Sequence, residues 1–285
     1  MFGLWGRKAL PDPGAPLGLS FGEMAALPQL QYQLFAIVAA HAALHLLLTS
    51  VPSPFAARAG YAAHYLPFVV CFAAMAAVGC HTWLCDAELA ELGATQAGRM
   101  WGSHAGAARL VASMLAVQLY DVPTSCVIPE LQSPTFIAHH LVVLFLACAA
   151  LRYNAFMYYG VYFFGVIETS TPLLALVDGF RDFPKLAEKL PATNEACRVG
   201  FAVAFFAVRI VGWVPVSVAF WRDALTLFEP GAARHGIPLV VVAFWLATHL
   251  GLTVLQWHWG LKIARAAYAM ASGDESQREN EAKGA

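Results

Sequence analysis

A few titratable side chains lie inside long apolar stretches of this sequence. Asp121 is followed by a histidine pair, His139-His140, and an acidic residue, Glu168, comes 28 residues after the second histidine. An imidazole titrates near neutral pH and a carboxylate can orient it, so these residue types together suit acid–base or acyl-transfer chemistry. Charged groups inside a membrane span cost about 2.5–3.5 kcal/mol and often mark function. The candidate catalytic residues are therefore His139, His140, Glu168 and Asp121.

Further polar residues fall in the same apolar stretches. Arg209 could pair with Glu168 or Asp121 from a neighbouring helix, and such a buried pair can hold helices in register without any chemistry. Pro172 follows Glu168 by four residues, leaves the carbonyl of Glu168 without its helical donor and is expected to kink the helix. The residues expected to contact a bound lipid are Tyr120, Ser170, Thr171, Arg209 and Gln256.

The composition places these residues in a membrane protein. Of 285 residues, 59% are hydrophobic and 12% charged, whereas soluble domains are about 45–50% apolar and about 25% charged. The net charge of -1 provides no basic field for nucleic acid. The six cysteines show no disulfide or CxxC pattern. His41 and His45, one helical turn apart, have the spacing of a metal clamp, but we favour a pair of polar side chains that are satisfied by packing on an apolar helix. We expect neither a metal nor a cofactor.

Seven apolar stretches are long enough to cross a bilayer, which needs about 20 residues per helix. The connection around 130–134 is short, so the two helices that it joins should be antiparallel neighbours. Runs such as 141–146 do not alternate, which excludes a β-barrel. We therefore predict an all-α polytopic membrane protein with spans at 30–51, 61–84, 108–129, 135–151, 155–178, 198–221 and 237–262.

The polar residues of different spans are expected at one level of the membrane. At 1.5 Å per residue they lie roughly 6–18 Å from the face that bears the C-terminus. We expect them to form one pocket that opens toward that face. Nine Lys and Arg residues on that face against seven on the other favour a cytosolic C-terminus. Residues 1–29 are interpreted as an N-terminal arm, and 271–285 as a polar disordered tail.

The order of these motifs resembles the TLC domain family, named for TRAM, Lag1 and CLN8. The resemblance rests on Tyr120-Asp121, the His139-His140 pair and the Glu-x-Ser-x-Pro run that starts at Glu168, with Arg209 and Gln256 downstream. It covers roughly residues 60–270 and leaves 30–59 as an extra N-terminal span. The run at Glu168 is most similar to the TLC-domain-containing (TLCD) branch. That branch often carries Arg-x-x-Ser-x-x-His in its first core span, of which the second span here shows none.

The resemblance implies six helices around a lipid-accessible cavity, residence in the endoplasmic reticulum and a role in membrane lipid composition. In the ceramide synthase branch the paired histidines belong to an N-acyltransferase centre that joins a fatty acyl-CoA to a sphingoid base. There His139 or His140 would act as base or acyl acceptor. Two departures weaken this reading: Val143 stands where that branch has Thr, and Thr171 where it has a second Asp.

Three functions follow as hypotheses. The first is a lipid-homeostasis protein that binds or senses membrane lipid in a polar cavity. The second is the N-acyltransferase, with acyl-CoA as substrate rather than cofactor. The third is a structural or trafficking factor in which the polar residues only fix the bundle. The expected partners are membrane lipids, including sphingolipids. A homodimer is a further alternative.

Overall fold

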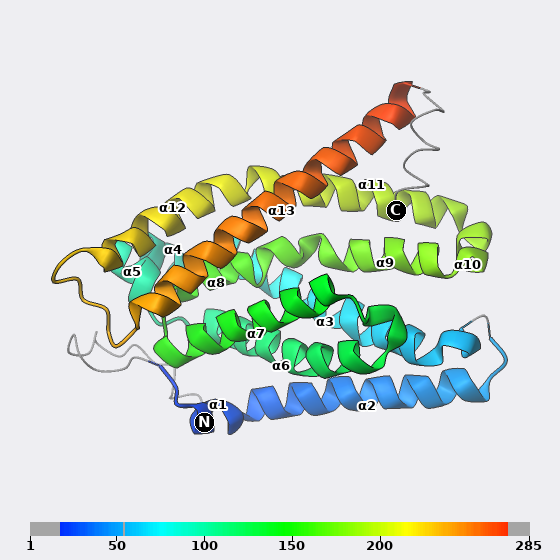
Figure 1. Cartoon of the computed structure of the whole chain (residues 1–285), viewed down its shortest axis with the longest axis horizontal. Helices are drawn as coiled ribbons and strands as arrows, with labels where there is room; N and C mark the ends of the chain where they lie inside the picture. The colour runs from blue at the N-terminus through cyan, green and yellow to red at the C-terminus, as the bar shows by residue number, and fades with distance from the viewer. Residues whose placement is uncertain (1–17, 54, 273–285) are drawn as a thin grey trace.

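The computed structural model describes residues 18–53 and 55–272. In this part of the chain it is all-helical and contains no strand. Seven helical segments are long and apolar enough to cross a membrane, which confirms the predicted fold class. They run back and forth side by side, so that α1 (Phe21–Ala25) and the end of α13 (Leu239–Ser272) lie at opposite ends of the bundle (Figure 1). The segments are Pro28–Ser50, Ala56–Cys85, Gln96–Val127, Pro134–Tyr153, Met157–Asp182, Pro191–Phe228 and Leu239–Tyr268.

Thirteen α-helices make up these segments and their connections within the described residues. Most of the expected N-terminal arm and nearly all of the expected tail lie outside those residues. The helices are α1 (Phe21–Ala25), α2 (Pro28–Ser50), α3 (Ala59–Cys85), α4 (Ala87–Gly93), α5 (Gln96–Trp101), α6 (Ala105–Val127), α7 (Pro134–Tyr153), α8 (Met157–Phe163), α9 (Thr171–Asp182), α10 (Pro184–Lys189), α11 (Pro191–Phe205), α12 (Trp213–Leu225) and α13 (Leu239–Ser272).

Helices α6 and α7 form the most extensive helix pair in the described part of the chain. A single 3₁₀ turn, Pro129–Leu131, joins them. Pro134 begins α7, where its missing N–H costs nothing because the first turn has no intrahelical acceptor. The prediction of antiparallel neighbours is confirmed, and the pairing sets Asp121 on α6 against His140 of α7.

The fifth span is broken near its middle. Helix α8 ends at Phe163, a 3₁₀ turn covers Val166–Thr169, and α9 starts at Thr171 with Pro172 in its first turn. The Thr169 hydroxyl donates to the Val166 carbonyl at 2.7 Å, which satisfies an oxygen that the break exposes. The expected kink at Pro172 is thus a change of helix type, and it places Glu168 in the turn.

The sixth span is irregular beside this break. Between α11 and α12 the segment Phe206–Val211 is a π-helix, in which the Gly212 N–H donates to the Ala207 carbonyl at 2.9 Å. The Tyr162 hydroxyl of α8 donates to the Val208 carbonyl at 2.7 Å. Short π segments are frequent at functional sites, and this one carries Arg209. Helix α13 crosses the bundle obliquely and leaves it at its C-terminal end (Figure 1).

Candidate functional site

A cavity of about 560 Å³ lies inside the bundle, with walls from α3, from α6 to α9 and from α11 to α13. Its volume falls in the range of about 300–1,000 Å³ that is usual for small-molecule sites. The walls are mostly aromatic and aliphatic, with a group of polar side chains partway along. Seven of the nine candidate residues line it, namely His139, His140, Glu168, Ser170, Thr171, Arg209 and Gln256.

Asp121 does not line the cavity but lies behind it. Its side chain is fully buried on α6, and its Oδ2 lies 3.4 Å from Nδ1 of His140. Its Oδ1 accepts a hydrogen bond of 2.8 Å from Nε2 of His64 on α3. Any effect of Asp121 on a ligand in the cavity must therefore pass through the His140 imidazole.

The surroundings of His140 fix its protonated nitrogen. Nδ1 lies 2.7 Å from Oε1 of Gln118, whose amide nitrogen points to the sulfur of Met114. Both neighbours of Nδ1, the Gln118 oxygen and the Asp121 carboxylate, are acceptors, so Nδ1 carries the hydrogen and donates. In the neutral ring Nε2 then keeps its lone pair, on the edge of the imidazole away from α6. His140 can act there as an acceptor or a base.

Tyr120 belongs to another face of α6. Its hydroxyl lies 2.5 Å from Nδ1 of His41 on α2, and its ring stacks on that of His64 at 5.5 Å between centroids. It does not line the cavity, so the expected lipid contact of Tyr120 is not made there. The rings of His41 and His45 are 6.3 Å apart. Across residues 18–53 and 55–272, no three His, Cys, Asp or Glu side chains gather as potential metal ligands.

Arg209 connects the irregular parts of the fifth and sixth spans. Its Nε donates to Oγ of Ser170 at 2.8 Å and its Nη2 donates to Oγ1 of Thr171 at 3.0 Å. The Thr171 hydroxyl donates to Oε2 of Glu168, and the same oxygen lies 3.6 Å from Nη2 of Arg209. The two charges balance each other while both side chains reach the cavity.

Two further polar side chains face the cavity without a full set of partners. Gln256 on α13 is 3% exposed, and its Oε1 has no hydrogen-bond partner in the described structure. The exposed His139 ring lies 5.4 Å from that of His140 and nearly perpendicular to it. The polar group therefore offers acceptors to a ligand as well as the Arg209 charge.

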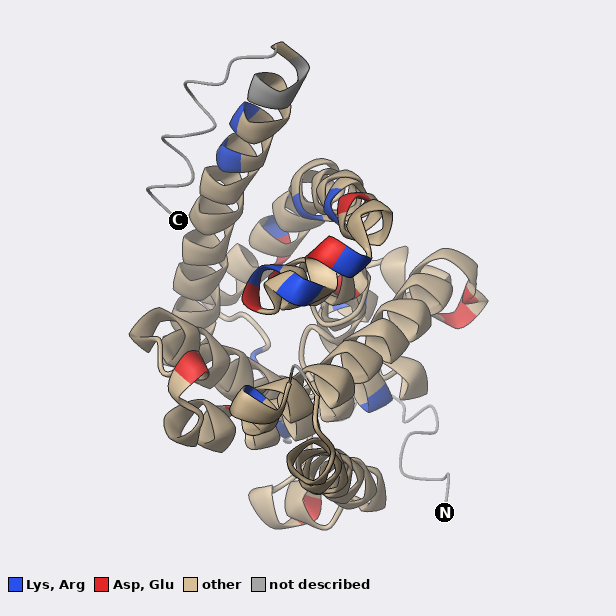
Figure 2. Cartoon of the chain, turned by 90° about the vertical axis from the view of Figure 1, so that its right-hand side faces the viewer, with Lys and Arg blue, Asp and Glu red and all other residues tan. Residues whose placement is uncertain are grey.

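The cavity extends toward the face on which the chain ends. Asp178 near the end of α9 and Lys262 on α13 line that part of it, whereas Phe156 and Trp245 line the opposite end. Figure 2 looks onto the C-terminal face and shows its acidic and basic residues. This extent agrees with the expected direction of the pocket.

A family model described as the TLC domain matches residues 55–265. This chain belongs to the TLC domain family. Six of the seven spans fall within or largely within the matched segment, and α2 precedes it. The protein is thus a multi-pass TLC-domain membrane protein. No curated protein and no solved structure matches the chain.

The site of this TLC-domain protein includes residues that sequence reasoning missed. His64 is the clearest, because Arg58-x-x-Tyr61-x-x-His64 keeps the spacing of Arg-x-x-Ser-x-x-His with tyrosine in place of serine. A search for the complete pattern passes over it. Gln118, the acceptor of His140, lies one turn before Asp121 among aliphatic residues, and nothing in the sequence singles it out.

His249 also lines the cavity, but as a fixed wall. The indole N–H of Trp221 donates to its Nδ1 at 3.0 Å, so the hydrogen of the neutral ring is on Nε2, 3.1 Å from Oγ of Ser217. The ring stacks on that of Trp213 at 4.8 Å between centroids. Both nitrogens are occupied, which leaves His139 and His140 as the imidazoles open to a ligand.

Proposed function

We propose that this protein binds a membrane lipid in the cavity and acts in membrane lipid homeostasis, in the endoplasmic reticulum with its C-terminus in the cytosol. The polar head of the lipid lies beside His139, His140, Glu168 and Arg209. Its apolar chain follows the aromatic and aliphatic walls. A lipid is the ligand class that matches both parts of the cavity, because it has a polar head and an apolar chain. Lipids also surround the protein in the membrane.

The observation that carries this proposal is the unpartnered oxygen of Gln256. A buried amide oxygen without a donor costs about 1–3 kcal/mol, and the Gln256 side chain that carries it lines the same cavity as His140. A head group with hydroxyl or amide hydrogens would satisfy both acceptors. If the cavity were only a packing gap between helices, it would need neither the Gln256 acceptor nor the His140 acceptor.

The geometry of His140 favours a second candidate, an acyl-CoA-dependent N-acyltransferase acting on a sphingoid base. The amine nitrogen of the sphingoid base would bond to the thioester carbonyl carbon while Nε2 of His140 takes a proton from that amine. The C–S bond then breaks, and the leaving thiolate takes the proton back from the His140 imidazolium, which returns the imidazole to its neutral form. Asp121 and Gln118 would hold the imidazole in the required tautomer, as the carboxylate does in hydrolase triads.

One experiment separates these functions. Purified protein is analysed for bound lipid by native mass spectrometry, and then supplied with acyl-CoA and a sphingoid base. The double variant His139→Ala, His140→Ala is compared with His258→Ala, which removes an exposed span histidine outside the cavity. Lipid bound by the wild type and the control but lost from the double variant supports lipid binding.

Turnover with the same dependence on the histidines would support the acyltransferase. The absence of both bound lipid and turnover in a folded wild-type protein would leave the structural role of the polar residues, and would overturn the proposal.

A further inference from the structure

The end of the cavity opposite the C-terminal face is closed by packed aromatic rings. The Phe156 ring lies 4.9 Å from that of Trp245 and 5.2 Å from that of Phe220, between centroids. Phe220 in turn lies 5.5 Å from Tyr159. These four residues come from the start of α8, from α12 and from α13, all are buried, and all line the cavity. They form its floor.

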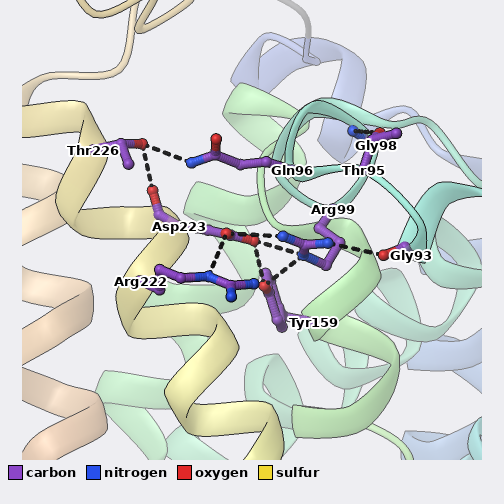
Figure 3. Close-up of polar contacts among 9 residues, drawn as sticks. All are labelled: Gly93, Thr95, Gln96, Gly98, Arg99, Tyr159, Arg222, Asp223 and Thr226. Atoms are coloured by element: carbon purple, nitrogen blue, oxygen red, sulfur yellow. Dashed lines mark hydrogen bonds and ion pairs between the residues drawn. The ribbon is translucent and has the colours of Figure 1, made fainter.

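A buried ion pair fixes this floor from behind (Figure 3). Arg99 of α5 donates from Nε and Nη2 to the two oxygens of Asp223, at 2.7 and 3.0 Å. The Tyr159 hydroxyl donates to Oδ2 of Asp223 at 2.5 Å. Asp223 is 1% exposed and the Arg99 side chain is 13% exposed, so the carboxylate is shielded from water while the guanidinium is partly buried. Two-point hydrogen bonding between a guanidinium and a carboxylate is strong and directional, which ties α5, α8 and α12 together.

The backbone at Phe156 is strained in a way that serves the floor. Phe156 has φ 58°, in the left-handed region that a bulky residue rarely adopts. Its N–H donates to the Met100 carbonyl at 2.7 Å, which holds the turn in place. Such strain costs on the order of 1–3 kcal/mol and persists where the surroundings impose it. Here it directs a large ring onto the end of the cavity.

The distance from the polar group to the floor sets the length of hydrocarbon chain that the cavity can hold. Along α7 the cavity wall runs from His140 to Ala150, and along α13 from Gln256 to Trp245. At 1.5 Å per residue both stretches are about 15 Å long. An extended hydrocarbon chain advances about 1.3 Å per carbon, so about 12 carbons fit between the head-group position and the floor.

We propose that Phe156, supported by the Arg99–Asp223–Tyr159 contacts, is a specificity-determining residue that limits the acyl chain length of the bound lipid to about 12 carbons beyond the head group. This inference rests on the proposed function, because it takes the polar group as the site of the head. A longer chain must bend or displace the rings.

The test uses the purified full chain and a series of saturated fatty acids from about 10 to about 20 carbons as competitors of a fluorescent fatty acid. Each buried methylene should raise the affinity about fourfold until the chain reaches the floor. In wild type the gain should stop near 12 carbons. Phe156→Gly removes the ring and suits the positive φ, so the limit should move about two to four carbons longer.

Asn154→Gly is the matched control, because Asn154 has φ 45° in the same turn but does not line the cavity. It should keep the wild-type limit. Trp245→Leu opens the floor from α13 and should also lengthen the limit, so the test survives if Phe156→Gly fails to fold. Fatty acids that bind with an unchanged limit in both floor variants would overturn this inference alone. If no fatty acid of any length binds, this inference fails, whereas the proposed function is decided separately by the lipid that native mass spectrometry finds on the purified protein.

Discussion

Asp121 lies directly behind His140, with its Oδ2 3.4 Å from Nδ1 of the imidazole and no surface in the cavity. Its other oxygen accepts a hydrogen bond from His64. One buried carboxylate therefore accepts a hydrogen bond from the His64 imidazole and lies at ion-pair distance from that of His140, and of these two only His140 lines the lipid-sized cavity. This makes Asp121 a positioning residue, whose effect on a ligand is to orient Nε2 of His140.

Asp121→Asn should loosen this orientation without emptying the space. The amide keeps the shape but loses the charge that both imidazoles face, so unfolding should become easier by about 1–3 kcal/mol. The ¹⁵N shifts of His140 should show a mixture of tautomers in place of one, and lipid retention should fall. A variant with the wild-type tautomer would contradict the role given to Asp121, even if it were less stable.

The position of Asp121 shows where the sequence could and could not predict the site. Residue types and spacing indicated that Asp121 meets the histidine pair, and the short turn before α7 brings it beside His140. They did not indicate which side of α6 faces the cavity, because consecutive residues on a helix point about 100° apart. Tyr120 thus turns to His41, and Gln118 reaches His140.

Arg209 and Glu168 should be energetically coupled. Arg209→Gln alone leaves the Glu168 carboxylate with only the Thr171 hydroxyl, and Glu168→Gln alone leaves Arg209 with neutral acceptors. Each single variant should therefore destabilise the protein more than the double variant does. A double-mutant cycle by thermal unfolding in detergent should give a coupling of about 1–3 kcal/mol. Strictly additive effects would show that the pair is not formed.

Substitutions of Tyr159 in the floor and of Asp223 behind it should lower the stability of the protein by different amounts. Tyr159→Phe removes one hydrogen bond to Asp223 and should cost about 1 kcal/mol. Asp223→Ala leaves the partly buried Arg99 guanidinium and the Tyr159 hydroxyl without their acceptor and should cost more, about 3–5 kcal/mol. Thermal unfolding of both variants measures the difference. Equal losses would mean that the carboxylate does not carry the contact.

Asp86, which lies outside the spans, should make the stability of the protein depend on pH. It caps α4 through the N–H groups of Glu88 and Leu89 and lies 3.2 Å from the imidazole of His104. Burial would raise the pKa of Asp86, but the Leu89 N–H and His104 outweigh it, so the pKa lies below its ordinary value of 3.8. The stability that ionised Asp86 contributes is therefore fully present above pH 3.8. It is lost as the pH falls through the lower pKa that Asp86 has in the folded protein.

Asp86→Asn keeps a capping oxygen but cannot titrate, and should cost less than about 1 kcal/mol at neutral pH. Wild type should lose more thermal stability than this variant when the pH is lowered from about 5 to about 3. Parallel pH curves for the two proteins would show that Asp86 makes no such contribution.

Helix length and apolar composition predicted all seven spans, because the bilayer sets both. The interruptions were harder to foresee. Pro172 indicated the one beside Glu168, but no proline or glycine run marks the π segment that carries Arg209. The left-handed backbone of Phe156 has no local signal either, since its turn is imposed by the contact with Met100. Such features depend on packing between spans that a sequence pattern does not contain.

The most direct test of the central claim is the lipid that remains bound to purified protein. Native mass spectrometry of wild type, His258→Ala and the double variant His139→Ala, His140→Ala should show lipid adducts on the first two and at least a tenfold lower occupancy on the third, with all three folded. Equal occupancy in the double variant, or no adduct on wild type, would contradict the account of a polar cavity that holds a lipid head group.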